Sequence, residues 1–127
     1  MKVVTVIARI LLGLIFLVFG LNGFLQFIPV KGWPPGLAGE FLTVLMQSRW
    51  VWIVSAFQLV GGALLLVNRY VPLALTLLGP VIVNILSYHL LLQHSAAQPA
   101  IIATICWVIL FYRYRQYFTS LFVQKVS

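Results

Sequence analysis

The chain has 127 residues, of which 63% are hydrophobic and only 7% are charged. About a quarter of the residues in a soluble domain are charged. Folding in water buries only about two-thirds of the surface of a chain of this length, so many of these apolar side chains would remain exposed to water. This composition excludes a soluble fold and indicates a lipid bilayer as the solvent. Eight Lys and Arg against a single acid give a net charge of +7, but the cations lie at the ends of apolar runs, which argues against nucleic-acid binding and is typical of membrane topology.

The first predicted helix covers residues 4–28. A helix needs about 20 mainly apolar residues to cross a bilayer, and this run is long enough. Lys2 before an apolar stretch resembles a signal peptide, but no convincing small-residue cleavage site follows, so we interpret the run as a retained helix. Three small residues in it permit close approach of a second helix, namely Gly13, Gly20 and Gly23.

Residues 38–48 have an amphipathic pattern. One helical face would carry Phe41, Leu42, Leu45 and Met46, and the opposite face Glu40, Thr43 and Gln47. This pattern predicts a short helix that lies in the membrane interface or folds back over the bundle. We expect Glu40 in its first turn, where a negative charge complements the helix dipole; a proton-handling role is the alternative.

Three further apolar runs predict three more spanning helices, at about 50–68, 70–93 and 99–117. Pro72 suits the first turn of its helix, where a missing N–H costs little. Arg113 and Arg115 are tolerated in the last helix because long basic side chains reach the headgroups. The predicted fold is therefore all-α: one domain over residues 1–127, an integral membrane four-helix bundle with a short amphipathic interfacial helix between helices 1 and 2.

The basic residues also predict the orientation. If both termini are cytoplasmic, six of them lie inside (Lys2, Arg9, Arg69, Arg113, Arg115 and Lys125) and two lie outside (Lys31 and Arg49). Lys and Arg are retained on the cytoplasmic side, so we expect a multi-pass protein of the inner (cytoplasmic) membrane with both N- and C-termini in the cytoplasm.

The candidate binding residues are polar side chains within the apolar helices, because lipid offers them no hydrogen bonds. They are Asn22, Gln26, Gln58, Asn84, Tyr88 and His89. Asn22 and Gln26 are four residues apart, as are Asn84 and Tyr88, so each pair shares a helical face. Turned inward, these groups would line an apolar pocket that suits a small lipophilic ligand such as a quinone. The simpler interpretation is interhelical hydrogen bonding that fixes the helix register.

No metal site and no catalytic residue is predicted. His89 and His94 are five residues apart and point in different directions on one helix, which is not a metal-ligand spacing. The single cysteine, Cys106, excludes an internal disulfide or dithiol pair.

Three stretches carry a resemblance to a known family: ARILLGLIFLVFGLNGF, QLVGGALLLVNRYVPLALTLLGP and VIVNILSYH. Over nearly its whole length the chain resembles the DoxX family of small four-helix bacterial membrane proteins. The residues that match the family pattern are Arg9, Gly20, Asn22, Gln58, Gly61, Gly62, Arg69, Pro72, Pro80 and Asn84. The family takes its name from a membrane subunit of a thiosulfate:quinone oxidoreductase, so the resemblance implies a quinone-facing or redox-partner role in a bacterial inner membrane.

We therefore expect a quinone-associated or redox-complex accessory subunit. Its expected partners are the lipid bilayer, a quinone or another lipophilic small molecule, and a redox protein or a second copy of the chain. The lack of a cysteine pair and of cofactor ligands argues against independent catalysis. One alternative is a non-enzymatic binding or assembly module, in which the polar residues only lock the bundle. A small transporter is less favoured, because no acid lies within a span.

Overall fold

The computed structural model describes residues 2–25, 34–92 and 98–125, and over these ranges the chain is helical with connecting turns. The helices are α1 (Lys2–Leu25), α2 (Gly36–Gln47), α3 (Trp50–Val67), α4 (Val71–Leu91) and α5 (Gln98–Arg113). Two short 3₁₀ turns follow, η1 (Arg115–Tyr117) and η2 (Thr119–Phe122). The predicted all-α class is confirmed.

The helix boundaries refine the sequence prediction. Three of the described helices, α1, α3 and α4, are long and apolar enough to cross a membrane. The predicted fourth span, 99–117, ends as an α-helix at Arg113, so α5 has 16 residues and is shorter than the usual spanning length. The last residues of the predicted first helix, 26–28, lie outside the described residues.

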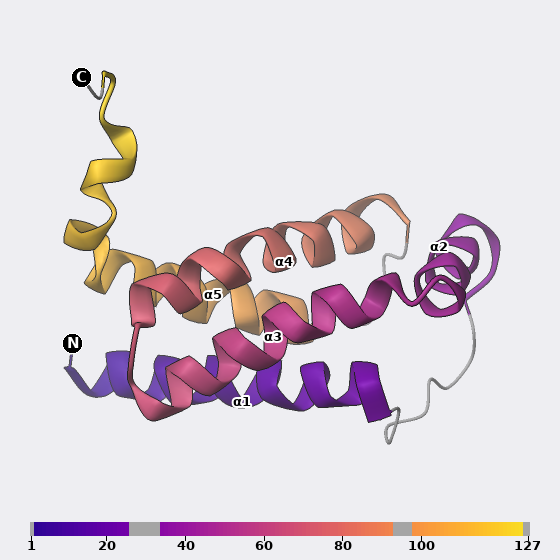
Figure 1. Cartoon of the computed structure of the whole chain (residues 1–127), viewed down its shortest axis with the longest axis horizontal. Helices are drawn as coiled ribbons and strands as arrows, with labels where there is room; N and C mark the ends of the chain where they lie inside the picture. Colours follow the sequence, from indigo (N-terminus) through magenta and orange to yellow (C-terminus); the bar gives the residue numbers. More distant parts are fainter. Residues whose placement is uncertain (1, 26–33, 93–97, 126–127) are drawn as a thin grey trace.

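The four long helices form a ring around one core. Contacts join α1 with α3, α3 with α4, α4 with α5 and α5 with α1. In Figure 1 these helices lie alongside one another, with both chain termini at one end, called here the terminal end, and α2 at the opposite end. The largest fully buried side chains are Phe16, Leu12, Leu65, Leu75, Leu78 and Leu110. The core is therefore a narrow column of aliphatic side chains along the bundle.

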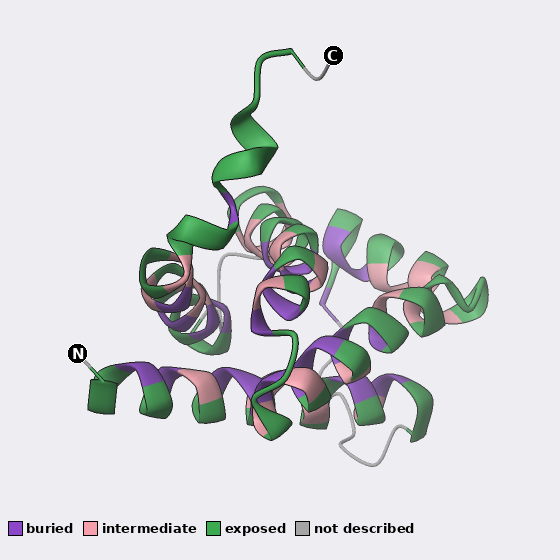
Figure 2. Ribbon diagram, turned by 60° about the vertical axis from the view of Figure 1, so that its left-hand side comes forward, coloured by how far each residue is buried: buried purple, intermediate pink, exposed green. Residues whose placement is uncertain are grey.

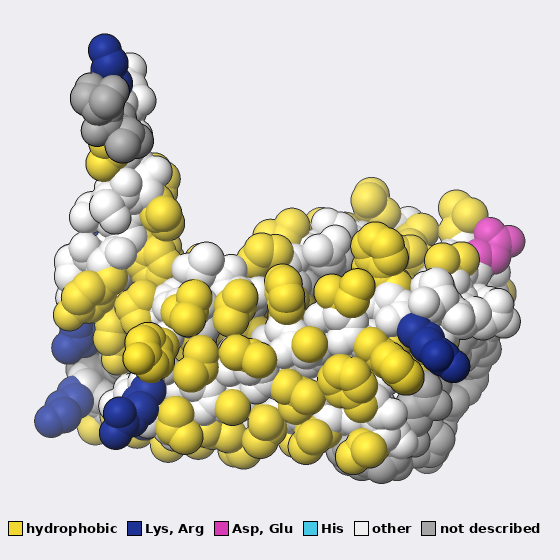
Figure 3. All heavy atoms as spheres, in the orientation of Figure 1, with side chains coloured by type: hydrophobic (Ala, Val, Ile, Leu, Met, Phe, Trp, Pro, Cys, Tyr) yellow, Lys and Arg dark blue, Asp and Glu magenta, His cyan; other side chains and the backbone are white. Residues whose placement is uncertain are grey.

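The outside of the bundle is apolar as well. Figure 2 shows that the buried residues are confined to the inward faces of the helices, and Figure 3 shows apolar side chains covering the visible face of the bundle. Ile53, Val83 and Leu90 are 59%, 62% and 72% exposed, respectively. An apolar surface on this scale is not stable in water, so the protein is a membrane protein whose outer faces contact lipid.

A seam of small residues holds α1 against α3. A Cβ atom built on Gly62 would lie 2.7 Å from the backbone nitrogen of Leu17 and 2.9 Å from the carbonyl oxygen of Gly13. In the opposite direction, from α1 to α3, a Cβ on Gly20 would lie 2.9 Å from the backbone nitrogen of Leu59. The two backbones are thus in direct contact, which confirms the predicted close approach at Gly13 and Gly20.

Arg9 connects α1 to the last turn of α3. Its Nη1 donates hydrogen bonds to the carbonyl oxygens of Leu65, at 2.5 Å, and of Leu66, at 3.3 Å. The last carbonyls of a helix have no N–H partner within the helix and carry partial negative charge. A guanidinium supplies both the missing hydrogen-bond donors and a compensating positive charge. Arg9 therefore has a defined structural position in the bundle.

Candidate functional site

A cavity in the bundle lies between α2, α3 and α4, and we call it the α2 cavity. It has a volume of about 420 Å³. Its lining residues are Phe41, Leu42, Leu45, Trp50, Val54, Val81, Asn84, Ile85, Tyr88 and His89. Most of these are apolar, and the exceptions come from the second half of α4. The apolar face of α2 thus folds back over the bundle, as its amphipathic pattern predicts.

The polar side chains of the α2 cavity follow one another along α4. Asn84 Nδ2 donates to the carbonyl oxygen of Pro80 at 2.9 Å, one turn earlier in the helix. The ring of Tyr88 lies 5.7 Å from that of Phe41 and 5.2 Å, edge to face, from the imidazole of His89. These contacts fix Tyr88 between α2 and its own helix. An amide, a phenol and an imidazole are therefore held along one apolar wall.

A second cavity lies between α1, α3, α4 and α5, and we call it the Gln58 cavity. It has a volume of about 290 Å³, and its lining residues are Ile15, Phe16, Phe19, Gln58, Ile85, His89, Pro99, Ala100 and Ala103. Gln58 is only 8% exposed, so its amide is a buried polar group inside the ring of helices. Ile85 and His89 line both cavities.

The sequence predicts one pocket, but the structure places the candidate residues in two adjacent cavities. Asn84, Tyr88 and His89 line the α2 cavity, whereas Gln58 lines the other together with His89. Asn22 is half-buried on α1 and is not among the lining residues of either cavity; Gln26 lies outside the described residues. The three amides of Asn22, Gln58 and Asn84 thus do not share one cavity.

The rotation of α4 explains this division. The residues of α4 that face the core include Leu78 and Ile82, and Asn84 lies roughly 120° around the helix from Leu78. Asn84 is consequently exposed at the side of the bundle that α2 partly covers. Sequence reasoning also missed the walls that α2 and Trp50 contribute. The amphipathic pattern of 38–48 was the available signal, since its apolar face needs a surface to cover.

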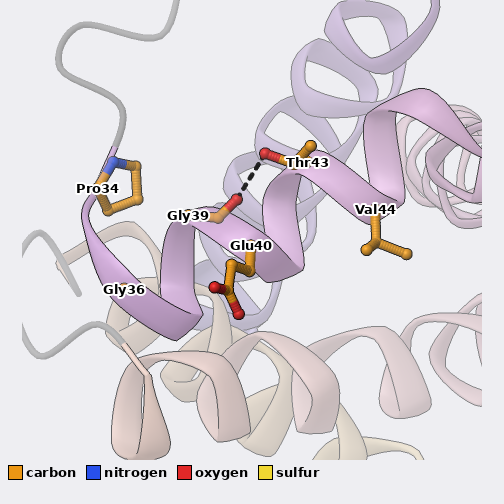
Figure 4. Close-up of a pocket in the computed structure, with 6 residues that line it drawn as sticks. All are labelled: Pro34, Gly36, Gly39, Glu40, Thr43 and Val44. Carbon is orange, nitrogen blue, oxygen red and sulfur yellow. Dashed lines mark hydrogen bonds between the residues drawn. The ribbon is translucent and has the colours of Figure 1, made fainter.

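A third, shallow depression lies beside α2 and is shown in Figure 4. It is lined by Pro34, Gly36, Gly39, Glu40, Thr43 and Val44. Thr43 Oγ1 donates to the carbonyl oxygen of Gly39 at 2.8 Å, and the carboxylate of Glu40 points away from it. The prediction that Glu40 lies in the first turn is wrong, because α2 begins two residues earlier than predicted, at Gly36. Glu40 belongs to the exposed polar face of α2.

Comparison with known proteins gives one match. The model of the family described as DoxX matches residues 4–90. No curated protein and no solved structure matches the sequence. The matched region runs from α1 to the end of α4, covers more than half of the chain and includes every residue that lines the α2 cavity.

Proposed function

Because this chain belongs to the DoxX family, we propose that it is an accessory subunit of a redox complex in a bacterial inner membrane. We propose further that its α2 cavity binds a quinone or a similarly lipophilic carbonyl compound. The observation that carries this proposal is the row of polar side chains, Asn84, Tyr88 and His89, along an otherwise apolar cavity.

The chemistry of the lining fits such a ligand. A quinone is a flat ring with two carbonyl acceptors, and Asn, Tyr and His side chains all carry N–H or O–H donors. The rings of Phe41 and Trp50 and the side chains of Leu42 and Leu45 provide apolar walls. A volume of about 420 Å³ lies within the usual range of small-molecule sites. A bound quinone would supply the redox chemistry, and this chain would hold and orient it.

The position of the cavity suits a ligand dissolved in lipid. Its residues Phe41, Trp50 and Asn84 are exposed on the outer face of the bundle, so the cavity opens sideways between helices. A ligand would enter from the bilayer without crossing the core. The chain's single thiol, Cys106, is buried in α5 away from this cavity. We therefore assign the transfer of electrons to a partner protein and the binding of the ligand to this chain.

Replacing Asn84 tests the proposal. Asn84→Leu removes the amide while keeping a side chain of similar size, and we expect quinone affinity to fall about tenfold, the effect of losing about 1.4 kcal/mol of binding free energy. The measurement is a titration of the purified protein with a short-chain ubiquinone or menaquinone analogue, followed by quenching of tryptophan fluorescence, since Trp50 lines the cavity.

Ser87→Leu is the matched control. Ser87 is also a polar, exposed residue of α4, but it does not line the cavity, so its replacement should leave affinity unchanged. Equal affinity of the two variants, or no saturable binding by the unaltered protein, would remove the quinone proposal. If Asn84→Leu instead lowers thermal stability or complex assembly and leaves binding intact, the assembly-module alternative is correct.

We also propose that α5 crosses the membrane as a fourth span and that both termini are cytoplasmic. The placement of both termini at one end of the bundle supports an even number of spans (Figure 1). Among the described basic residues, Arg49 precedes α3 at the α2 end. The others belong to the half of the bundle at the terminal end, namely Lys2, Arg9, Arg69, Arg113, Arg115 and Lys125. This distribution agrees with the retention of positive charge on the cytoplasmic side.

A labelling experiment checks this orientation. Single cysteines introduced in a Cys106→Ala background at Lys125 and at Gln47 are treated, in intact cells, with a thiol reagent that does not cross the inner membrane. We expect labelling at position 47 and protection at position 125 until the cells are lysed. The reverse pattern would invert the proposed topology.

A further inference from the structure

The C-terminal tail, residues 114–125, turns away from α5 at the terminal end and runs crosswise to the long helices (Figures 1 and 2). Its turns are closed by backbone hydrogen bonds from Tyr117 N–H to the Tyr114 carbonyl, at 3.0 Å, and from Leu121 N–H to the Phe118 carbonyl, at 3.0 Å. Because the bundle axis crosses the bilayer, a crosswise segment at its end lies along the membrane surface.

Aromatic packing fixes the direction of the tail. Phe118 is buried, and its ring centroid lies 4.9 Å from that of Phe111. Phe111 in turn stacks on Trp107, with centroids 5.2 Å apart and rings only 9° from parallel. Trp107 Nε1 donates to the carbonyl oxygen of Leu75 in α4 at 2.9 Å. The base of the tail is thus attached to the core of the bundle through three successive rings.

The corner between α5 and the tail forms a groove of about 430 Å³, which we call the corner groove. It is lined by Phe111, Arg115, Gln116, Phe118, Thr119 and Phe122. Three phenyl rings make its walls apolar, and Arg115 places a cation beside them. Arg115 Nη1 donates to the Tyr112 carbonyl at 2.6 Å, and the guanidinium lies over the Tyr112 ring at 4.2 Å. A guanidinium has five N–H donors, so this exposed, oriented group retains donors for an anion.

The surroundings of the groove favour an anionic, amphipathic occupant. Leu121 and Phe122 are 70% and 79% exposed, although both are strongly apolar. Arg113 and Lys125 flank the groove in sequence, and the only acid of the chain, Glu40, belongs to α2 at the opposite end. Apolar and aromatic side chains beside Arg and Lys at a membrane surface are the combination that binds anionic lipids.

We propose that the corner groove is a binding site for an anionic phospholipid of the surrounding bilayer. The guanidinium of Arg115 binds the lipid phosphate, with Gln116 and Thr119 as further polar groups, and an acyl chain lies against Phe111, Phe118 and Phe122. This site is distinct from the α2 cavity, lies at the other end of the bundle and does not depend on the proposed quinone function.

A lipid titration tests the site. The purified protein in a neutral detergent is titrated with fluorescent phosphatidylglycerol, and Arg115→Gln is expected to weaken binding about fivefold, the equivalent of about 1 kcal/mol for one basic residue. Arg115→Lys keeps the positive charge and should retain most of the affinity. Phe122→Ser removes one phenyl ring from the apolar wall of the groove and should weaken binding. Phosphatidylcholine should bind more weakly than phosphatidylglycerol.

Arg49→Gln is the matched control. Arg49 is an exposed arginine next to an aromatic ring, 5.1 Å from the Trp52 centroid, but it lies at the α2 end. Its replacement should leave phosphatidylglycerol affinity unchanged. Equal losses in Arg115→Gln and Arg49→Gln would overturn the proposal, as would full competition by inorganic phosphate, which would indicate a simple anion site. Amide exchange in residues 114–125 should also be slower in nanodiscs with phosphatidylglycerol than without it; equal exchange would overturn it too.

Discussion

Replacing Gly62 by alanine should separate α1 from α3 and cost about 3 kcal/mol of folding free energy, the upper part of the usual range for overpacking a core. The added methyl group would lie 2.7 Å from the Leu17 nitrogen, 2.9 Å from the Gly13 oxygen and 3.2 Å from the Leu17 Cα. All three are backbone atoms, so no side-chain rotation relieves the contact. We expect a clearly lower melting temperature in detergent and loss of the monodisperse peak in size-exclusion chromatography.

Gly79→Ala separates this effect from the general effect of changing a helical glycine. Gly79 also lies in an apolar helix, but the nearest atom to its added Cβ is Trp107 Cζ2 at 3.4 Å, an ordinary van der Waals distance. Because alanine has the higher helix propensity, this variant should be as stable as the unaltered protein or slightly more so. Similar losses in both variants would contradict the backbone contact between α1 and α3.

Arg9→Met should lower the free energy of unfolding by about 2 kcal/mol, because it removes the charge-assisted hydrogen bonds to the last carbonyls of α3. The substitution keeps an unbranched apolar stem of comparable length in the bundle, so the packing of α1 changes little. The Leu66 carbonyl then loses its guanidinium donor, and the Leu65 carbonyl keeps only the backbone N–H of Asn68, at 3.2 Å. Thermal unfolding in detergent measures the loss.

Lys2→Met is the control for net charge. It removes one positive charge from the same helix, but Lys2 is exposed at the first position of α1, so stability should be unchanged. Arg9→Lys should give an intermediate loss, since an ammonium group retains the charge but is shorter than a guanidinium. A fully stable Arg9→Met protein would show that the contact contributes nothing to folding.

The helices could be predicted because each depends on local properties of the sequence. Apolar length alone identified α1, α3 and α4, and the start of α3 at Trp50 was predicted correctly. The amphipathic pattern identified α2, with its start misplaced by two residues. The end of α5 was predicted four residues too late, because the turn after Arg113 depends on Phe118 packing against Phe111, a contact that the apolar pattern does not reveal.

The candidate site could be predicted only in part, because periodicity does not define how each helix is rotated in the bundle. Asn84 and Tyr88 share a face of α4, as their spacing predicts, and that face lines the α2 cavity. Gln58 faces the interior of the ring instead. Which residues meet is decided by the glycine contacts between α1 and α3 and by the fold of α2 over α4. Both are tertiary contacts between segments distant in the chain.

Ile85 and His89 each line both the α2 cavity and the Gln58 cavity, so single side chains separate the two at these positions. Interiors are close-packed, so a displacement of either side chain by an occupant on one side changes the shape available on the other. Any movement of Ile85 or His89 therefore reshapes the α2 cavity and, in the same step, the cavity that holds the Gln58 amide.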